Sequence, residues 1–402
     1  MSNTQKKNVP ELRFPGFEGE YSLDIFGNLA TNKSDKFNPQ NENASIDIEL
    51  DCIEQNTGRL IKIYNSKEFS SQKNKFNPQN VLYGKLRPYL NKYYFTKKSG
   101  VCSSEIWVLK STKEDKLLNL FLYYFIQTKR YSDVASKSAG SKMPRADWGL
   151  IENIRVYFPE LCEQQKIGEF FSKLDRQIEL EEQKLELLQQ QKKCYMQKIF
   201  SQELRFKDDN GNDYPEWEEK KLGELSQIVR GASPRPIKDP KWFNKESDIG
   251  WLRISDVTDQ NGKIYHLEQK LSIEGQEKTR VLLTTHLLLS IAASIGKPVM
   301  NFVKTGVHDG FLIFLNPKFN IIFMYYWLDY FKEKWSKYGQ PGSQVNLNSE
   351  IVKSQTLNMP SNHEQEKVGL FFSRNEKLIE LQQEKIMYLK RRKQALILKM
   401  FI

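Results

Sequence analysis

The stretch PELCEQQKIGEFFSKLDRQIELEEQKLELLQQQKKCYMQKIF occupies residues 159–200 and returns at residues 360–401 as PSNHEQEKVGLFFSRNEKLIELQQEKIMYLKRRKQALILKMF. When the second copy is laid over the first at a shift of 201 positions, 16 of the 42 residues are identical. Typical amino-acid usage gives about one identical residue in seventeen by chance. The chain therefore contains an internal repeat, and a repeat of this length determines the architecture before any single motif does.

The repeat continues upstream in a weaker form. Residues 11–14 return at 203–206, residues 121–124 return in part at 323–326, and residues 140–141 match residues 342–343. The second copy follows the first by 192 residues at residues 11–14 and by 202 residues at the aromatic residues 121–124, so the middles of the two copies differ by insertions. Each copy therefore consists of a divergent globular part followed by a closely repeated helical part.

Both helical parts carry the pattern of a coiled-coil seam. Residues 163–200 contain no proline and a single glycine, and their apolar residues recur at alternating steps of three and four. At about 1.5 Å per residue, a helix of about 38 residues is roughly 57 Å long, which is too long for one small domain to cover. We expect the helix-pair and partner interface to include Ile167, Phe171, Leu174, Ile178, Leu185 and Leu188 in the first helix, and Val368, Phe372, Ile379, Ile386 and Leu389 in the second.

Polar residues interrupt the seam at Glu181, Lys192, Asn375, Gln382 and Lys393. Polar seam residues set register and partner choice at some cost in stability, so we expect the helices to join a bundle with other chains. Equivalent stripes that pack on each other favour a pseudo-two-fold, which makes the helices antiparallel. The predicted fold class is α+β, with two mixed α/β domains related by the repeat and separated by two long helices that form an antiparallel coiled coil.

This organisation predicts four segments. Residues 1–158 form an N-terminal arm and the first domain, residues 159–202 a central helix, residues 203–359 the second domain and residues 360–402 a C-terminal helix. The aromatic residues Tyr123, Tyr124, Tyr325 and Trp327 lie in apolar stretches of expected helix, and we interpret them as core.

Composition narrows the class of protein. A chain of 402 residues exceeds what one core usually serves. Its 61 lysines and arginines against 50 aspartates and glutamates give a formal charge of +11, a balance that suits a polyanionic partner but also many other proteins. Four widely spaced cysteines without a Cys-x-x-Cys pair argue against disulfides and zinc and fit the cytoplasm. We expect neither a secretory signal, since no apolar run follows the first lysines, nor a membrane span.

At this point the sequence resembles a known family, the specificity subunits of type I restriction-modification enzymes. The resemblance covers almost the whole chain. It rests on the openings Tyr21–Leu29 and Trp217–Leu225, on Leu82–Leu90 with Ser103–Glu105, on Gly140-Ser141 with Gly342-Ser343, and on the proline and then Glu-Gln at the entry to each helix. Tyr21 stands in the first opening where Trp217 stands in the second.

The resemblance implies that each globular part is a target-recognition domain that reads one half of a bipartite double-stranded DNA site. It implies that the helices set the gap between the half-sites and dock two methyltransferase (modification) subunits, with restriction/translocase subunits joining in the full complex. No cofactor is expected on this chain, while S-adenosylmethionine, ATP and magnesium are expected on the partner subunits.

DNA contacts are expected on loops held by a rigid scaffold. Arginine and lysine suit guanine edges and phosphates, and asparagine and glutamine suit adenine. The candidates are Lys85, Arg87, Tyr89, Asn91, Lys92, Ser141, Lys142 and Arg145 in the first domain, and Arg230, Ser233, Arg235, Arg253, Lys297, Ser343, Gln344, Asn346 and Asn348 in the second. For any single one of them the alternative is a solvated surface side chain, because most lysines and arginines are simply exposed.

Two other classes of protein fit the sequence less well. An ATPase or methyltransferase is disfavoured, because Gly296-Lys297 is followed by proline, no Gly-x-Gly-x-x-Gly occurs, and Asn38-Pro39 and Asn77-Pro78 both continue to glutamine. The four histidines have no ligand spacing, so no metal site is expected, and His308-Asp309 is interpreted as a loop or strand-edge pair. A coiled-coil adaptor would explain the helices but not two large, diverged domains.

Overall fold

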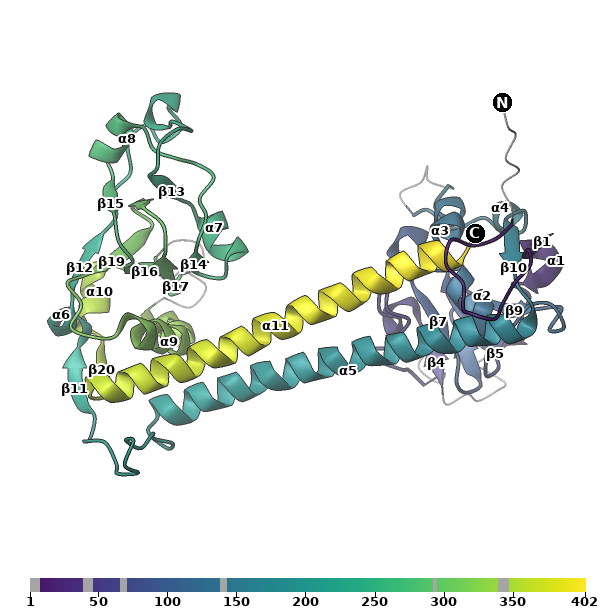
Figure 1. Ribbon diagram of the computed structural model, residues 1–402, viewed down its shortest axis with the longest axis horizontal. Coiled ribbons are helices and arrows are strands. Elements are labelled where there is room, and N and C mark those ends of the chain that lie inside the picture. Colours follow the sequence, from purple (N-terminus) through teal and green to yellow (C-terminus); the bar gives the residue numbers. More distant parts are fainter. Residues whose placement is uncertain (1–7, 39–45, 66–70, 138–142, 292–294, 339–346) are drawn as a thin grey trace. The chain divides into compact units, whose positions relative to one another are not determined.

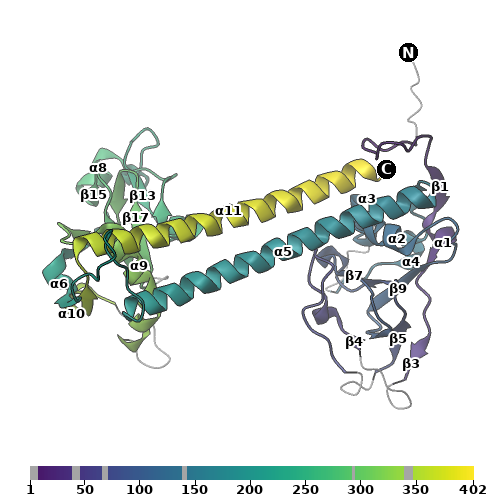
Figure 2. The same cartoon turned by 60° about the horizontal axis from the view of Figure 1, so that its bottom comes forward.

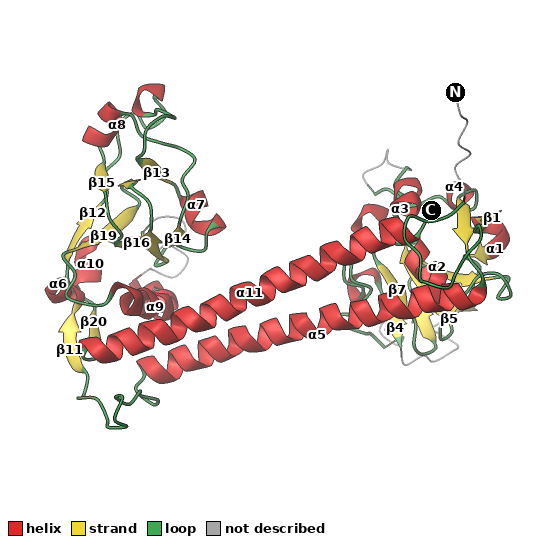
Figure 3. Cartoon of the chain, viewed as in Figure 1, coloured by secondary structure: helices red, strands yellow, loops and turns green. Residues whose placement is uncertain are grey.

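The computed structural model describes residues 8–38, 46–65, 71–137, 143–291, 295–338 and 347–402. It divides into two compact units, Met1–Gln183 with Gln383–Ile402 (unit 1) and Lys184–Gln382 (unit 2). Two long helices, α5 (Leu161–Phe200) and α11 (Asn362–Met400), each contribute residues to both units (Figure 1). Each unit mixes strands with short helices (Figure 3), so the predicted mixed α/β class of both domains is confirmed.

Unit 1 contains two four-stranded sheets, of order β2-β9-β6-β7 and β3-β5-β8-β4, and the antiparallel pair β1-β10. The strands are β1 (Ser22–Ile25), β2 (Ala30–Thr31), β3 (Lys36–Phe37), β4 (Asp47–Ile48), β5 (Lys73–Phe76), β6 (Val81–Gly84), β7 (Tyr93–Phe95), β8 (Gly100–Cys102), β9 (Ile106–Ser111) and β10 (Arg155–Phe158). The helices of this domain are α1 (Phe26–Leu29), η1 (Leu50–Cys52), η3 (Pro88–Leu90), α2 (Asn119–Phe125), α3 (Lys129–Ala135) and α4 (Trp148–Ile151).

Unit 2 contains a five-stranded sheet of order β12-β19-β16-β17-β14, a three-stranded sheet β13-β18-β15 and the antiparallel pair β11-β20. The strands are β11 (Glu218–Lys221), β12 (Gln227–Arg230), β13 (Gly250–Leu252), β14 (Lys263–Ile264), β15 (Arg280–Leu282), β16 (Leu287–Ser290), β17 (Pro298–Asn301), β18 (Thr305–Val307), β19 (Phe311–Leu315) and β20 (Thr356–Met359). The helices are α6 (Leu222–Leu225), η4 (Pro240–Trp242), α7 (Ile254–Asp259), α8 (Ile273–Glu277), α9 (Ile321–Phe331), η5 (Lys332–Tyr338) and α10 (Ser349–Ser354).

The sequence repeat corresponds to a repeat of pairing. In each domain the first strand pairs antiparallel with the strand just before a long helix, β1 with β10 and β11 with β20. The central pairs β6-β9 and β16-β19 also correspond, because Gly84 faces Ile106 in one and Ser290 faces Phe311 in the other. The two domains therefore share a scaffold although their middles differ in length.

The Glu-Gln pair at the start of each long helix is buried and links three segments. The Gln164 side chain donates to the Pro159 carbonyl and accepts from the Leu118 backbone N–H, at 2.8 and 2.9 Å. Gln365 makes the same contacts with Pro360 and Asn320, both at 2.8 Å. The repeated glutamine thus ties the start of each helix to the backbone just before α2 or α9.

The preceding glutamate explains the repeated arginine and the aromatic difference between the openings. Glu163 accepts from Arg13 Nε and Nη2 at 2.8 and 2.7 Å, and from the Tyr21 hydroxyl at 3.3 Å. Its counterpart Glu364 accepts from Arg205 Nη2 at 2.8 Å and from Trp217 Nε1 at 3.0 Å. Tyrosine and tryptophan are interchangeable here because each donates one hydrogen bond to a buried carboxylate.

Within each unit the two long helices run antiparallel. In unit 1, Asp175 pairs with Lys393 and Glu181 pairs with Lys385, so residue numbers increase along α5 in the direction in which they decrease along α11. In unit 2 the same order holds where Lys192 pairs with Glu376 and the ring of Tyr195 contacts Phe371. The predicted antiparallel pairing of the helices is confirmed in both units.

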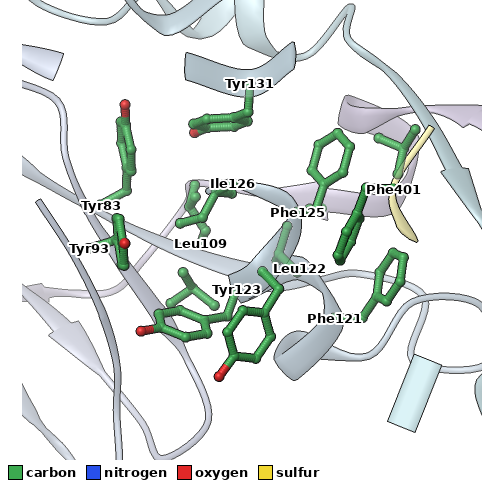
Figure 4. Close-up of a cluster of buried hydrophobic side chains, with 14 of the residues drawn as sticks. Tyr83, Tyr93, Leu109, Phe121, Leu122, Tyr123, Phe125, Ile126, Tyr131 and Phe401 are labelled. Atoms are coloured by element: carbon green, nitrogen blue, oxygen red, sulfur yellow. The ribbon is translucent and has the colours of Figure 1, made fainter. Parts of the chain in front are cut away.

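The helices complete the hydrophobic core of each domain. In unit 1 the core combines α2 with Ile167 and Phe171 of α5 and with Leu389, Ile397 and Met400 of α11, all buried. Phe401 lies in this cluster beside Phe121, with ring centroids 4.9 Å apart (Figure 4). Figure 2 shows α2 against α5. The rings of Tyr124 in α2 and Phe171 in α5 are 5.2 Å apart.

In unit 2 the core combines α9 with Met196, Ile199 and Phe200 of α5 and with Val368 and Phe372 of α11. The aromatic residues interpreted as core, Tyr123, Tyr124, Tyr325 and Trp327, are all buried, as predicted.

The seam residues divide by depth. Ile167, Phe171, Val368 and Phe372 are fully buried, Leu174, Ile178, Ile386 and Leu389 nearly so, and Leu185, Leu188 and Ile379 are half-buried. The polar seam residues Lys192 and Lys393 each pair with a carboxylate of the other helix, so no further chain is needed to satisfy them. No helix in the described residues combines the length and apolar character needed to span a bilayer.

Candidate nucleic-acid interface

In domain 1 the loop between β6 and β7 carries five of the predicted contact residues. The backbone turns twice through the left-handed region, with φ of 53° at Arg87 and 46° at Asn91, on either side of η3. Arg87 and Tyr89 are exposed, and the Tyr89 side chain retains 57% of its accessible surface. Lys92 and Asn91 are tied down instead, the first to the Leu50 carbonyl at 2.6 Å and the second to the Asn56 side chain at 3.1 Å. Arg87 and Tyr89 are thus the residues of this loop that face solvent most fully.

Arg145 lies beside this loop although it is 60 residues away from Lys85 in the sequence. Leu86 and Arg145 form an isolated β-bridge, and the Arg87 N–H donates to the Pro144 carbonyl at 2.7 Å. The Arg145 guanidinium donates to both carboxylate oxygens of Glu105, at 2.9 and 3.1 Å. This pairing holds the pKa of Glu105 below its usual value. Ser141 and Lys142, also predicted as contacts, lie outside the described residues.

In domain 2 three predicted contact residues converge on one aspartate, Asp309. The Ser233 hydroxyl donates to Asp309 Oδ1 at 2.8 Å, and Arg235 Nη2 donates to Oδ2 at 2.7 Å. Arg230 Nε donates to the Asp309 backbone carbonyl at 2.6 Å. Burial alone would raise the pKa of Asp309, but the Ser233 hydrogen bond and the charge of Arg235 hold it below the usual value. The carboxylate is therefore charged, and each of its oxygens accepts a hydrogen bond.

Arg253 borders the same place from another element. Its guanidinium donates to both oxygens of Asp256, at 3.1 and 2.7 Å, at the start of α7. Together with Arg230, Asp309, Trp251 and His308 it lines an open recess of about 350 Å³. Burial lowers the pKa of His308, and its Nδ1 accepts from the Gly310 N–H at 2.8 Å, so the neutral ring carries its proton on Nε2.

Two other predicted contacts in domain 2 have structural partners elsewhere. The Asn348 side chain accepts from the Ile351 N–H at 3.0 Å and caps α10. Lys297 Nζ donates to the Val257 carbonyl at 3.2 Å, and burial, with Lys332 nearby, lowers its pKa. Neither side chain joins the Asp309 cluster. Ser343, Gln344 and Asn346 lie outside the described residues.

Glu105 and Asp309 occupy the same turn of the repeated scaffold. The Ile106 N–H donates to the Ser103 carbonyl in domain 1, and the Phe311 N–H donates to the His308 carbonyl in domain 2, just before the central strands β9 and β19. Each acid thus precedes the equivalent strand and holds an exposed arginine, Arg145 or Arg235. Sequence reasoning missed both acids as members of the site, because carboxylates are repelled by phosphates and their arginines lie 40 and 74 residues away.

A larger cavity of about 930 Å³ lies in unit 1 between β7, α2 and the long helices. Within it Asp175 accepts from Lys393 Nζ and from the Tyr124 hydroxyl, at 2.6 and 3.0 Å. In the described part of the chain no three histidine, cysteine, aspartate or glutamate side chains gather in a way that could hold a metal ion.

Comparisons with known proteins agree with this organisation. A family model described as the type I restriction modification DNA specificity domain matches the chain twice, over residues 20–190 and 214–391. The MjaVIII specificity subunit of Methanocaldococcus jannaschii is 26% identical over 310 residues, which are 72% of this chain and 71% of that protein. The EcoDI specificity subunit of Escherichia coli is 25% identical over 169 residues, 40% of this chain and 37% of that protein.

Two solved structures share the fold. One, described as the structural basis of complex assembly and conformational transition of the type I R-M system, has a TM-score of 0.61 at 16% identity and covers 94% of this chain and 96% of its own. The other, a type I restriction-modification S subunit from M. genitalium, has a TM-score of 0.57 at 14% identity and covers 98% and 99%. Since the two family matches span far more than half of the sequence, the chain belongs to the type I restriction modification DNA specificity family.

Proposed function

We propose that this chain is the sequence-reading subunit of a type I restriction-modification enzyme, and that each domain reads one half of a bipartite target in double-stranded DNA. One observation carries the proposal. The same scaffold occurs twice, and at the equivalent turn each copy presents an exposed arginine held by an acid, yet the residues around the two turns differ. Two domains with the same scaffold but different contact residues suit two half-sites of different sequence.

The exposed apolar side chains of the long helices favour the binding of two copies of one partner. Among the apolar side chains that the helices expose, Leu180 at 48% and Tyr388 at 62% lie in unit 1, and Leu187 at 64% and Leu381 at 48% lie in unit 2. Leu381 is the repeat counterpart of Leu180, and Tyr388 that of Leu187. We assign these equivalent surfaces to two methyltransferase (modification) subunits, with restriction/translocase subunits joining in the full complex.

On this proposal the chain has no catalytic role and binds no cofactor, and S-adenosylmethionine, ATP and magnesium bind to the partner subunits. The sequence supports this division, because neither a phosphate-binding Gly-Lys-Ser/Thr loop nor an Asn-Pro-Pro-aromatic motif occurs in it. We place the complex in the cytoplasm, where its DNA substrate would be found.

Exchange of one domain tests the proposal. Residues Trp217–Leu347 are replaced by the corresponding segment of another recognition domain, and methylated adenines are mapped across the genome of a host that carries the partner subunits. Only one half of the methylated motif should change. A motif that changes in both halves, or in neither, would contradict independent half-site recognition.

A further inference from the structure

We propose that Asp309 is the positioning residue of a base-reading site in domain 2, where it orients Arg235 toward a guanine of that domain's half-site. The inference rests on the proposed function and adds to it the kind of contact and the residue that sets it. Asp309 itself is not assigned a contact with DNA.

The geometry singles out Asp309 because its two carboxylate oxygens and its backbone carbonyl accept hydrogen bonds from three residues, one at the end of β12 and two in the loop that follows. Oδ1 and Oδ2 hold Ser233 and Arg235, and the backbone carbonyl holds Arg230. The Asp309 N–H in turn donates to the Ser233 hydroxyl oxygen at 3.2 Å. The aspartate is therefore fixed from both its side chain and its backbone, while the Arg235 side chain keeps 70% of its surface exposed.

The charges favour a base over a phosphate as the target of Arg235. Phosphate binding rewards an uncompensated positive charge that displaces counterions. Arg235 is instead paired with an ionised carboxylate, so the pair carries no net charge and would bring a negative group toward the phosphates. A guanine edge is neutral and offers two acceptors, O6 and N7, to a guanidinium. Asp309 engages one nitrogen of a fork that has five N–H donors, so donors remain for such an edge.

The surroundings repeat the same chemistry. Arg253, which also lines the recess, is paired with Asp256, and the Arg230 backbone carbonyl accepts from Arg280 Nε at 2.7 Å. Arg235 and Arg253 are therefore each oriented by a carboxylate, which suits directional recognition of a base. Domain 1 provides a second case, since Glu105 holds Arg145 at the equivalent turn.

The test uses the complete complex of this chain with its methyltransferase partners. The variants are Arg235→Ala, Asp309→Asn and the double variant, with Asp248→Asn as the matched control, because Asp248 forms an exposed ion pair with Lys304 in the same domain. Binding is measured to duplexes that carry every base at each position of the half-site, over a series of salt concentrations.

We expect Arg235→Ala to lower discrimination at one guanine position by about 5- to 150-fold, the range of one good bidentate contact. Asp309→Asn should relax the same position and leave the others unchanged, and the double variant should be no worse than Arg235→Ala alone. Ser233→Ala, which removes only one partner of the carboxylate, should relax that position more weakly. Asp248→Asn should bind as the wild type does.

Opposite outcomes overturn the inference. If Asp309→Asn tightens binding to all duplexes and Arg235→Ala weakens it uniformly with a smaller salt slope, Arg235 contacts a phosphate. If the Asp309→Asn and Ser233→Ala variants both keep the wild-type preference for the guanine, and unit 2 keeps its wild-type unfolding temperature, Asp309 does not position Arg235. A wild-type complex that recognises no bipartite sequence would instead refute the proposed function itself.

Discussion

Replacing Phe401 with alanine should destabilise unit 1 and leave unit 2 unchanged. The side chain is 7% exposed and packs in the domain 1 core, with its ring 4.9 Å from that of Phe121 and 6.3 Å from that of Phe171. Buried phenylalanine-to-alanine substitutions cost about 3–5 kcal/mol. Because Phe401 lies at the edge of the cluster, just after α11, we expect the lower value of about 3 kcal/mol.

The assay must resolve the two units. For a unit of roughly 200 residues, 1 kcal/mol corresponds to about 2–4 °C, so the unit 1 transition should fall by about 6–12 °C. Hydrogen exchange followed by mass spectrometry assigns the loss, and amides of α2 should lose protection whereas those of α9 should not. Thermal unfolding of the same samples gives the shift.

Two further variants serve as controls. Leu398→Ala removes a side chain that is 72% exposed on the same turn of α11 and should change stability by less than about 0.5 kcal/mol. Phe200→Ala, at the repeat counterpart of Phe401, should destabilise unit 2 instead, because Phe200 packs on Phe372 and Phe323. Equal destabilisation of both units by Phe401→Ala, or none in either, would refute the assignment of Phe401 to the domain 1 core.

Three further predictions follow from the helices. Arg205→Ala should destabilise unit 2 by about 3 kcal/mol in chemical denaturation, because it leaves the buried Glu364 without its guanidinium, and Arg205→Lys should recover part of the loss. The pKa of Glu376 is lowered: burial opposes this, but Lys192, Lys263 and Tyr326 outweigh it. The stabilising contribution of ionised Glu376 should therefore be complete above the unfolded pKa of about 4.3 and be lost as the pH falls further. Unit 2 of the Glu376→Gln variant should accordingly lose less stability than wild-type unit 2 on acidification. Thermal unfolding between about pH 3 and pH 6 measures the difference. Leu180→Glu and Leu381→Glu should each remove one methyltransferase subunit from the complex in native mass spectrometry without lowering the unfolding temperature; retention of both subunits would contradict the docking assignment.

Periodicity and repetition in the sequence predicted the long helices well, because both are local signals. The helix expected over residues 163–200 begins two residues earlier, at Leu161, and ends at Phe200 as expected. The aromatic segments were interpreted as core for the same reason, and α2 and α9 bury them. What the repeated residues touch was not predictable, since Arg13 and Glu163 are 150 residues apart and no spacing rule connects them.

The candidate interface was predicted only in part. Residue type and loop context selected Arg145, Arg230, Ser233 and Arg235 as candidates, but not the acids Glu105 and Asp309 that hold them, because these pairs form only when distant strands are assembled. The same rule also selected Asn348 and Lys297, whose side chains have structural partners in a helix cap and at a backbone carbonyl. Residue type alone does not separate a polar side chain that faces solvent from one that completes a local hydrogen bond.

The packing of α11 into domain 1 has a consequence for synthesis on the ribosome. Domain 2 has Met196, Ile199 and Phe200 available before its own strands emerge, and it needs only the start of α11 to be complete. Domain 1 is made first, yet its core includes residues up to Phe401, about 240 positions after β10 ends. At about 5–20 residues per second, the first domain waits about 10–50 seconds with an apolar groove along α2 open to solvent. The nascent chain therefore completes its domains in the reverse of the order in which it makes them, and its N-terminal half is the part that needs protection from aggregation until α11 has been made.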